Sequence, residues 1–327
     1  MKKHFIKVAV IAALFFANAQ ALFAAEEKAD PISLTLQADA AYYPLSARIT
    51  GGDHFAPITG PYSGLEGAVT LNGQYKIATP LGENWLLSGA NVGLGAAIEV
   101  TPISFKPKLS VDFTPLPFLI FKAGTSVGFG WNIGSIEGLC LLNKGNSNYE
   151  PLSTFAHPYY DLWASATFQF DTGAIIPGDW THVVILATYK TTYSGLMGLD
   201  KDAIYEWQCS KNKAQGLEYE VQGILGYQMP TMLRLAGVMV KSQGHYNGAD
   251  YGTYDKNYDG SFATVNISPV MQFKFTDKDE LYCLFDFSSR RSFGTSYERD
   301  GQSLRLTKTG REWYFQRFAL SWSHKLR

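Results

Sequence analysis

Alternation of apolar and polar side chains, with a period of two residues, is the dominant pattern along this chain. It is clearest over residues 65–77, where apolar residues or glycines alternate with mostly polar ones, as in Leu65-Glu66 and Leu71-Asn72. Neighbouring side chains of a strand point to opposite faces, so this period predicts β-strands with one apolar and one polar face. No segment beyond the N-terminus sustains a helical period.

The alternation recurs often enough to predict about twelve strands, at residues 32–42, 65–77, 86–99, 105–113, 121–132, 162–171, 183–190, 217–225, 233–240, 264–275, 285–288 and 313–326. Several of these runs reach the roughly ten residues that a membrane strand requires, whereas strands of soluble sandwiches usually have about 5 to 6. Charges on the polar faces would also be costly in a dry core. The predicted fold is all-β, an antiparallel transmembrane β-barrel of about 12 strands, with 10 or 14 also possible. In residues 233–240 both faces are apolar, so their orientation stays open.

The connections between these segments support a barrel. Short links at 79–84, 116–117, 172–179, 229–231 and 276–279 alternate with long ones at 48–62, 134–158, 192–215, 242–260 and 288–311. The exception is the link at 101–102, which is short although it is expected to be external. Outer-membrane barrels have short periplasmic turns and longer external loops. We therefore expect both chain ends on the periplasmic side and the long loops outside. Pro107 and Pro269 fall within predicted strands, where we expect β-bulges.

The N-terminal residues 1–25 have the pattern of a secretory signal peptide. Lys2, Lys3 and Lys7 precede the apolar stretch 8–16, and small residues follow up to Ala21 and Ala25. The apolar core is too short to span a bilayer. We expect cleavage after Ala21 or Ala25, leaving residues 26–327 as a single domain. With 17% charged residues and a formal net charge of −1, the chain does not favour a nucleic-acid partner.

With these features the chain resembles, over its whole mature length, the outer-membrane β-barrel proteins of double-membraned bacteria. The resemblance is to the porin-like architecture and not to a particular subfamily. It implies Sec export, contact with outer-membrane lipid and the barrel-assembly machinery, and in most such families passage of small solutes. Those families usually end on an aromatic residue, whereas this chain ends on Leu326 and Arg327.

Function must then come from the inner wall of the barrel, where charges of both signs are expected. The candidates for the lumen or a solute site are Lys106, Lys108, Lys122, Lys190, Glu218, Glu220, Arg234, Lys274, Asp286, Arg290 and Arg317. They form either a polar constriction that binds solute or a salt-bridge network that fills a structural barrel. Glycines on the same face, including Gly93, Gly124, Gly128 and Gly130, remove volume from one wall, which could therefore host a solute or a folded-in loop.

The main functional hypothesis is a narrow channel for small polar or amphipathic solutes. The alternative is a non-conducting surface scaffold or adhesin barrel. An outer-membrane lipid hydrolase is the weaker third hypothesis, because no His lies two residues before a Ser in the mature chain, the arrangement expected on one strand face. We therefore expect no enzymatic activity and no cofactor.

Two further groups of residues suggest sites in the long loops. Asp255, Asn257 and Asp259 match the first half of a calcium loop, but Asn266 stands where the bidentate acid is expected, so calcium binding remains a weak hypothesis. Cys140 and Cys209 lie in separate long loops of a protein destined for an oxidising compartment. They are either a disulfide pair across the barrel mouth or two thiols.

Overall fold

The computed structural model describes residues 30–327, so the predicted signal peptide lies outside the described residues. Within this part of the chain, no helix is long and apolar enough to cross a membrane. Twelve strands form the wall, and they are β1 (Ile32–Ser46), β3 (Ile58–Ala78), β4 (Asn91–Thr101), β5 (Ser104–Leu116), β6 (Leu119–Gly130), β9 (Tyr159–Asp171), β10 (His182–Leu196), β13 (Gly216–Gln228), β14 (Leu233–His245), β15 (Thr264–Lys274), β16 (Asp279–Phe293) and β17 (Lys308–Lys325).

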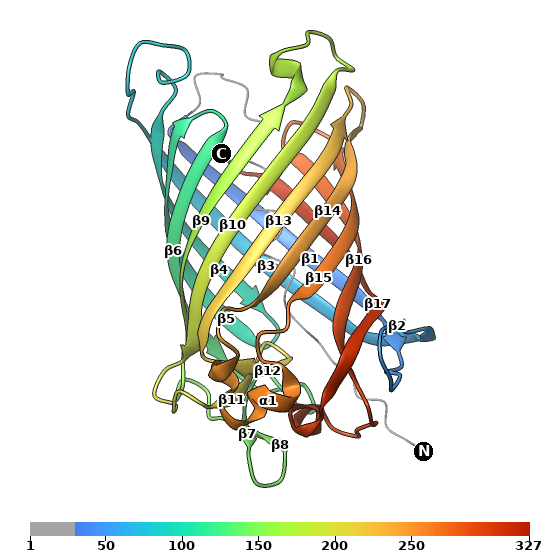
Figure 1. The fold of residues 1–327 in the computed structure, drawn as a ribbon. Helices are drawn as coiled ribbons and strands as arrows, with labels where there is room; N and C mark the ends of the chain where they lie inside the picture. Colours follow the sequence, from blue (N-terminus) through green and yellow to red (C-terminus); the bar gives the residue numbers. More distant parts are fainter. Residues whose placement is uncertain (1–29) are drawn as a thin grey trace.

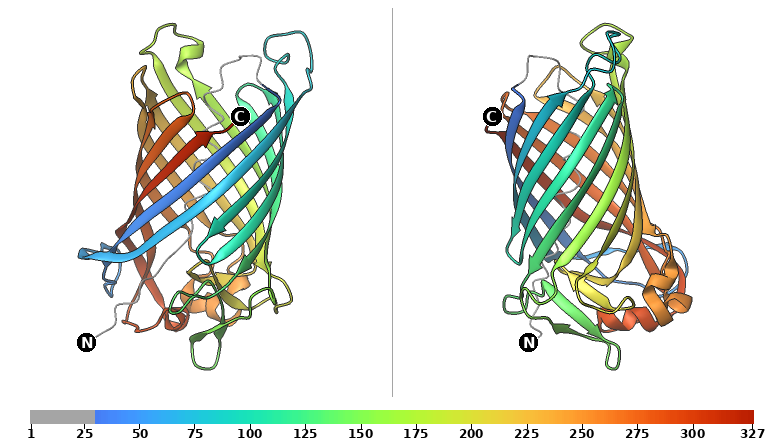
Figure 2. Two further views of the ribbon diagram at one scale, coloured as in Figure 1. Left: turned by 180° about the vertical axis from the view of Figure 1, so that it is seen from behind. Right: turned by 90° about the vertical axis from the view of Figure 1, so that its left-hand side faces the viewer.

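Each wall strand pairs antiparallel with its neighbour along the chain, and β1 pairs with β17 to close the sheet. The closing register places Ala38 opposite Trp322 and Tyr42 opposite Phe318. Figures 1 and 2 show the resulting tilted barrel, in which the C-terminus lies at the end with the short turns. The predicted all-β class and strand number are therefore confirmed. Closure leaves no long free sheet edge, which a strand structure in lipid requires.

The two faces of the wall separate as the alternation predicts. In β3, Val69 points outward and is 48% exposed, whereas Thr70 points inward and is 4% exposed. The outward face carries large exposed apolar side chains around the whole barrel, including Leu65, Leu94, Leu109, Leu162, Leu225, Val238, Ile267 and Phe287. A continuous apolar band of this extent is stable against lipid and not against water. These strands therefore span a membrane.

One part of the inner wall is more apolar than expected. A buried cluster joins the inner faces of β1, β10 and β14 to β17, and it comprises Ala41, Val184, Leu235, Met239, Val270, Tyr282, Leu284 and Ala319. This cluster resolves the orientation of residues 233–240, in which both faces are apolar. Val238 and Val240 face outward, while Leu235 and Met239 pack inside the barrel.

The strands extend further toward the long loops than the alternation indicates. For example, β10 continues to Leu196 and β16 to Phe293. The link between β3 and β4 is longer than predicted, since Trp85 and Leu86 belong to the connection and not to a strand. Hydrogen bonding of the backbone, and not apolar alternation, carries the wall past the expected strand ends.

The two prolines do not produce the bulges that we expected. Ile98 lies opposite Pro107, and Val238 lies opposite Pro269, without a register shift at either proline. On the other side of each proline the ladder is interrupted but resumes in the same register. A missing N–H thus removes local pairing without adding a residue. Register shifts occur elsewhere, between Asp286 and Phe287 and between Leu233 and Leu235.

The long loops fold over one end of the barrel (Figure 1). Four short strands form a second sheet in the order β12-β11-β7-β8, with bounds β7 (Leu139–Asn143), β8 (Asn148–Pro151), β11 (Ile204–Trp207) and β12 (Ser210–Ala214). We call this sheet the lid. Helical turns η4 (Gly248–Tyr254), α1 (Asp255–Tyr258) and η5 (Asp300–Arg305) contribute residues to the buried cluster beneath it. At the same end, β2 (His54–Phe55) lies in the connection between β1 and β3 and pairs parallel with the start of β17. At the other end, η3 (Thr172–Ala174) forms part of a turn.

Candidate functional site

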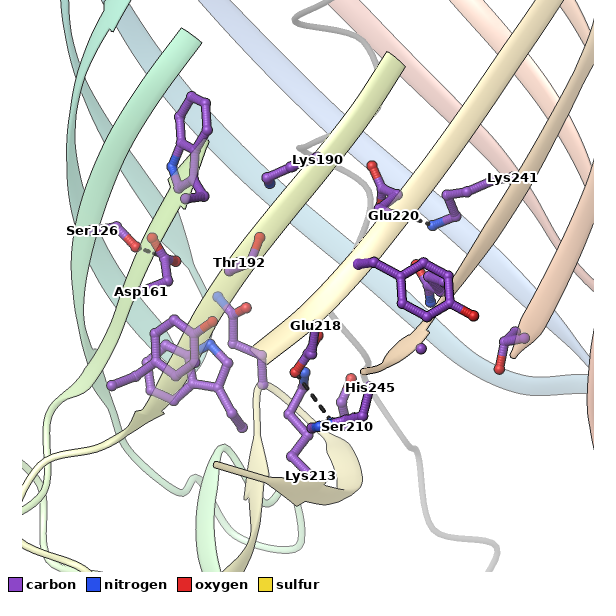
Figure 3. Close-up of a pocket in the computed structure, with 18 of the residues that line it drawn as sticks. Ser126, Asp161, Lys190, Thr192, Ser210, Lys213, Glu218, Glu220, Lys241 and His245 are labelled. Atoms are coloured by element: carbon purple, nitrogen blue, oxygen red, sulfur yellow. Dashed lines mark hydrogen bonds and ion pairs between the residues drawn. The ribbon is translucent and has the colours of Figure 1, made fainter. Parts of the chain in front are cut away.

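A cavity of ≈ 290 Å³ lies between the lid and the inner wall at the loop end of the barrel. Figure 3 shows side chains converging on it from several wall strands and from β12 of the lid. We call this cavity the chamber. Strands β4, β5, β9, β10, β13, β14 and β16 contribute the charged wall residues, and the loop between β14 and β15 contributes aromatic rings. Its volume lies near the lower end of the range for small-molecule sites, about 300–1,000 Å³.

The glycine wall explains how the lid enters the barrel. The indole of Trp207 lies against Gly128 and Gly130, and a Cβ at Gly128 would be only 2.5 Å from that ring. Trp207 also stacks on Tyr159 of β9, with ring centroids 4.8 Å apart and planes 8° apart. The interpretation that this wall hosts a folded-in loop is confirmed, since small residues allow the close approach.

Gln208 fixes the lid to the neighbouring strands β4 and β5. Its Nε2 donates hydrogen bonds to Glu99 at 3.2 Å and to Ser104 at 2.8 Å. Glu99 is also paired with two lysines, at 3.3 Å from Lys106 and 2.5 Å from Lys108. Glu99 is almost completely buried, and these donors compensate the cost of burying its charge. Lys106 and Lys108 share the single carboxylate of Glu99, so this edge of the chamber carries a net positive charge.

The other side of the chamber holds a second set of charges. Lys241 lies 3.7 Å from Glu220, and His245 Nε2 lies 3.5 Å from Glu218. The other ring nitrogen of His245 lies 3.0 Å from Asp250. Lys190 takes a different partner, since its ammonium lies 5.1 Å from the ring centroid of Trp163. This is the geometry of a cation–π contact.

The chamber therefore has more basic than acidic groups. Its lining includes six basic side chains, Lys106, Lys108, Lys190, Lys213, Lys241 and Arg291, and four acidic ones, Glu99, Asp161, Glu218 and Glu220. Confinement by a low-dielectric wall strengthens the field of such groups. Aromatic rings of Tyr159, Trp163, Trp207 and Tyr219 supply flat apolar surfaces between the charges.

Five of the predicted lumen residues line the chamber, namely Lys106, Lys108, Lys190, Glu218 and Glu220. Lys122 lies elsewhere on the wall, opposite Asp112 of β5 and Ser165 of β9. The sequence thus identified the charged wall but could not indicate which members share a cavity.

Asp286 and Arg317 belong to a buried network rather than to the chamber. Arg317 lies 3.3 Å from Asp286 and 3.5 Å from Glu66, and it donates a hydrogen bond to the Tyr43 hydroxyl at 3.1 Å. Arg290 instead pairs with Glu312, whose Oε1 also accepts the backbone N–H of Ile49. The interpretation as a salt-bridge network therefore holds for this wall, whereas the charges of the other wall surround a cavity whose binding of solute stays a prediction.

Arg234 and Lys274 do not face the lumen site that we expected. Arg234 sits at the register shift near the start of β14, beside the side chain of Gln228. Lys274 lies at the end of β15, where it is partly exposed and pairs with Asp277 of the short turn at 2.9 Å. Both residues lie near the short-turn end of the barrel. The alternation thus assigned them to the correct strands but did not indicate their position along the barrel axis.

The two aspartates of the calcium hypothesis, Asp255 and Asp259, already have protein partners. Asp255 Oδ1 accepts the backbone N–H of Gly260 at 2.9 Å, and Asp259 pairs with Lys308 at 2.5 Å. Asn257 lies in the short helix α1 between them. The arrangement stabilises the loop without metal, and calcium binding stays an untested prediction.

Cys140 and Cys209 are thiols in the structure and not a disulfide. Cys140 is fully buried in β7, and its pKa is raised to about 12, because burial disfavours the thiolate and Glu206 and Glu137 add negative charge. A thiol with so high a pKa is a poor nucleophile for disulfide exchange. The disulfide alternative is therefore not realised here.

Several chamber residues were not identified from the sequence. Trp207, Gln208, Ser210 and Lys213 were assigned to a long loop, and His245 was placed in another. Their loops lack the alternation that would have revealed short strands. The inward glycines were the one signal that pointed to an inserted loop, although they could not identify which loop it was.

Comparisons with known proteins concern the architecture alone. No family model matches the chain, and no curated protein matches it. Among solved structures, a KdgM porin is 7% identical, with a TM-score of 0.37 over 90% of this chain and 99% of that chain. The NanC porin is 10% identical, with a TM-score of 0.40 over 89% and 100%. The beta domain of a Bordetella autotransporter is 8% identical, with a TM-score of 0.41 over 91% and 100%.

The geometry of the chain itself defines its class. An even number of antiparallel strands closes on itself, the outer wall is apolar, and charged groups lie inside. Closed strand structures of this kind satisfy every backbone group of a membrane-spanning sheet. The molecule is a twelve-stranded β-barrel of the outer-membrane type in which a folded-in lid caps an internal chamber.

Proposed function

We propose that this protein is a narrow outer-membrane channel for small polar or amphipathic solutes, which bind in the chamber during passage. The observation that carries the proposal is the cavity of ≈ 290 Å³ at the barrel mouth, lined by charged, hydroxyl and aromatic groups. A purely structural lumen would pair its charges and fill its volume, as the Arg317 network does on the opposite wall. The chamber keeps both volume and polar groups.

The proposal includes an orientation and a location. The barrel lies in the outer membrane, with the lid and long loops at the cell surface and the short turns in the periplasm. A solute from outside would then meet the lid first and the chamber next. We also propose that the protein works without enzymatic chemistry, with outer-membrane lipid and the barrel-assembly machinery as its partners.

Planar bilayers test the channel directly. The refolded full-length mature protein should give discrete conductance steps, and small polar solutes added on the lid side should block them in a concentration-dependent way. A heat-denatured sample prepared in the same detergent is the control for contaminating channels. Absence of conductance in protein shown to be folded would contradict the channel.

The lid supports one alternative, a non-conducting surface scaffold. Trp207 and Gln208 bind the lid to four consecutive wall strands, β4, β5, β6 and β9, and a lid held in this way would favour a closed mouth. In that case the folded barrel shows no conductance in planar bilayers, and its binding activity resides in the outer loops. Hydrolysis of phospholipid by the same sample would instead overturn the non-enzymatic part of the proposal.

A further inference from the structure

Three carboxylates converge on one ammonium group at the loop end of the barrel, where Figure 1 shows the lid strands. Lys211 Nζ of β12 lies 2.7 Å from Glu137, 3.6 Å from Glu206 and 3.8 Å from Asp300. When all three carboxylates are ionised, their negative charge exceeds the charge of the single ammonium. Such an arrangement favours a cation of higher charge at the same place.

The thiol of Cys140 belongs to the same cluster. Cys140 of β7 is directly opposite Glu206 of β11 in the lid sheet, so the two side chains share one face. One ligand atom each from Glu137, Cys140 and Glu206 lies within 4.8 Å of the other two. Ligand atoms around a tetrahedral zinc ion are about 3.5 Å apart. A shift of about 1 Å in the partly exposed Glu137 side chain would bring all three onto one ion.

Glu206 gives an independent indication of a missing cation. The residue is only 1% exposed, yet its Oε2 has no hydrogen-bond partner. The same oxygen faces Lys211 at 3.6 Å, which is longer than a hydrogen bond. A buried oxygen without a hydrogen bond costs free energy, and an ion bound to it would remove that cost. The Cys140 thiol likewise makes only a long contact, at 3.8 Å, to Asn132 Oδ1.

A second cavity leads to this cluster. It has a volume of ≈ 460 Å³, and residues of β8, β12 and η5 line it together with Glu137. The side chains of Glu137 and Lys211 are 36% and 23% exposed, so both can be reached from solvent. An ammonium displaced from the cluster would keep two other partners, since Asp300 lies 3.8 Å away and the ring centroid of Tyr149 lies 5.0 Å away.

We propose that Glu137, Cys140 and Glu206 bind one divalent cation of the zinc type, with water in the fourth position and the ammonium of Lys211 displaced. Zinc accepts thiolate and carboxylate ligands together, whereas calcium and magnesium prefer oxygen ligands alone. The cation replaces the proton of the Cys140 thiol, and that proton passes to solvent.

The ion would clamp the lid. Glu137 and Cys140 belong to the connection between β6 and β9, whereas Glu206 belongs to the connection between β10 and β13. One cation bound to all three therefore joins two long loops that the chain reaches separately. This inference goes beyond the proposed channel and does not depend on conductance.

Cobalt(II), used in place of zinc, reports the ligands directly. The refolded full-length mature protein in detergent, freed of metal with a chelator, is titrated with cobalt chloride under a thiol-free reductant. One equivalent should give the visible bands of tetrahedral cobalt and a thiolate-to-cobalt charge-transfer band. Zinc chloride should then abolish both, and calcium chloride should not. Absence of these bands in folded protein, or equal displacement by calcium, would overturn the proposal.

Variants with matched controls identify the ligands. Cys140→Ser should lose the charge-transfer band, whereas Cys209→Ser, which changes the other lid thiol, should keep it. Glu137→Gln should weaken zinc binding at least about tenfold, the smallest loss typical even of groups that only support a ligand. Glu150→Gln is its control, because Glu150 lines the same cavity outside the cluster. Survival of the band in Cys140→Ser, or equal zinc affinity in the two glutamine variants, would contradict the assignment.

Lys211→Gln separates metal binding from damage to the lid. Removal of the competing ammonium should strengthen zinc binding severalfold, whereas a disturbed lid would weaken it. Weaker binding in Lys211→Gln would therefore argue against an ion at the position of the ammonium.

Proteolysis tests the clamp and keeps it distinct from the channel. Zinc should slow cleavage within residues 197–215 in the unchanged protein and not in Cys140→Ser. Zinc binding by a folded barrel without conductance would support the metal site and refute the channel. A conducting barrel that binds neither cobalt nor zinc would refute the metal site alone.

Discussion

The absence of a side chain at Gly128 allows the lid to pack against the inner wall of the barrel. Trp207 occupies the space that a Cβ at Gly128 would fill, and it is further held by stacking on Tyr159. Gly130 provides the same clearance two residues later on the same face of β6. The glycines cost strand stability, since they lack a side chain to pack, and the inserted indole offsets that cost.

Gly128→Val is therefore expected to displace Trp207 and loosen the lid while leaving the wall intact. Limited proteolysis of folded protein should show several-fold faster cleavage within residues 197–215, and conductance should rise if the lid restricts passage. Gly223→Val is the control, because no atom lies within 4 Å of a Cβ at that position. Unchanged cleavage in Gly128→Val would show that the indole does not hold the lid.

The two faces of β3 give a second prediction at this scale. Val69→Arg places a charge on the outer face, where we expect a loss of about 2 to 4 kcal/mol in the free energy of unfolding if the site lies near the bilayer midplane. Thr70→Ala on the inner face should cost less, because the Thr70 hydroxyl has no hydrogen-bond partner. Urea titration of both variants refolded in vesicles measures the difference. A larger loss for Thr70→Ala would argue against the membrane-facing assignment of Val69.

Among the elements, the lid contains a buried carboxyl group, that of Glu206, whose protonation should affect the stability of the lid. Glu206 of β11 is only 1% exposed, and burial raises the pKa of its carboxyl to about 8. Lys211 of β12 lies 3.6 Å from Glu206 and opposes the rise, while Glu137 and Asp300 reinforce it. Burial of the carboxylate is the largest effect and outweighs the attraction of the ammonium.

The closed lid is consequently expected to weaken as pH rises. With a pKa near 8 in the closed lid and an ordinary value of 4.5 when exposed, Glu206 binds more proton in the closed state throughout that window. Stability therefore falls from about pH 4.5 to pH 8. Hydrogen exchange of residues 204–214 should be faster at pH 8 than at pH 6 after correction for intrinsic rates. Glu206→Gln should remove most of this difference, and a lid that tightens toward pH 8 would contradict the assignment.

For the whole molecule, the distribution of long and short connections predicts an orientation. The lid, the loop between β14 and β15 and the residues of η5 gather at one end (Figure 2), and the short turns gather at the other, apart from the turn between β4 and β5, which lies beside the lid. Large folded loops at one end are typical of the external face of an outer-membrane barrel. The described N-terminal end of β1 lies beside the C-terminus at the opposite end.

Epitope tags on intact cells test this orientation. A tag at Asn146, which is exposed between β7 and β8, should be accessible to antibody, while a tag at Glu83 in the link between β3 and β4 should become accessible only after permeabilisation. The two sites are both exposed in the structure, so differences in burial do not explain the contrast. Labelling of intact cells at Glu83 and not at Asn146 would show that the barrel has the opposite orientation in the membrane.

The sequence by itself determined the class, the approximate strand number, the outward and inward faces and the alternation of connections. These properties follow from a period of two residues, which depends only on local backbone geometry and on the two environments of the wall. Val69 and Thr70 show how directly the pattern translates into exposure. The inner charges Lys106, Lys190 and Glu218 were found in the same way.

Only the tertiary structure decided which inner charges act together. Lys274 and Lys190 obey the same alternation, but one pairs in a short turn and the other faces the chamber, because depth along a tilted wall depends on register between strands. The lid was decided by contacts far apart in the sequence, such as Trp207 against Gly128 and Gln208 with Glu99. A loop without periodicity carries no local signal for such contacts, so the capped chamber exists only in the folded barrel.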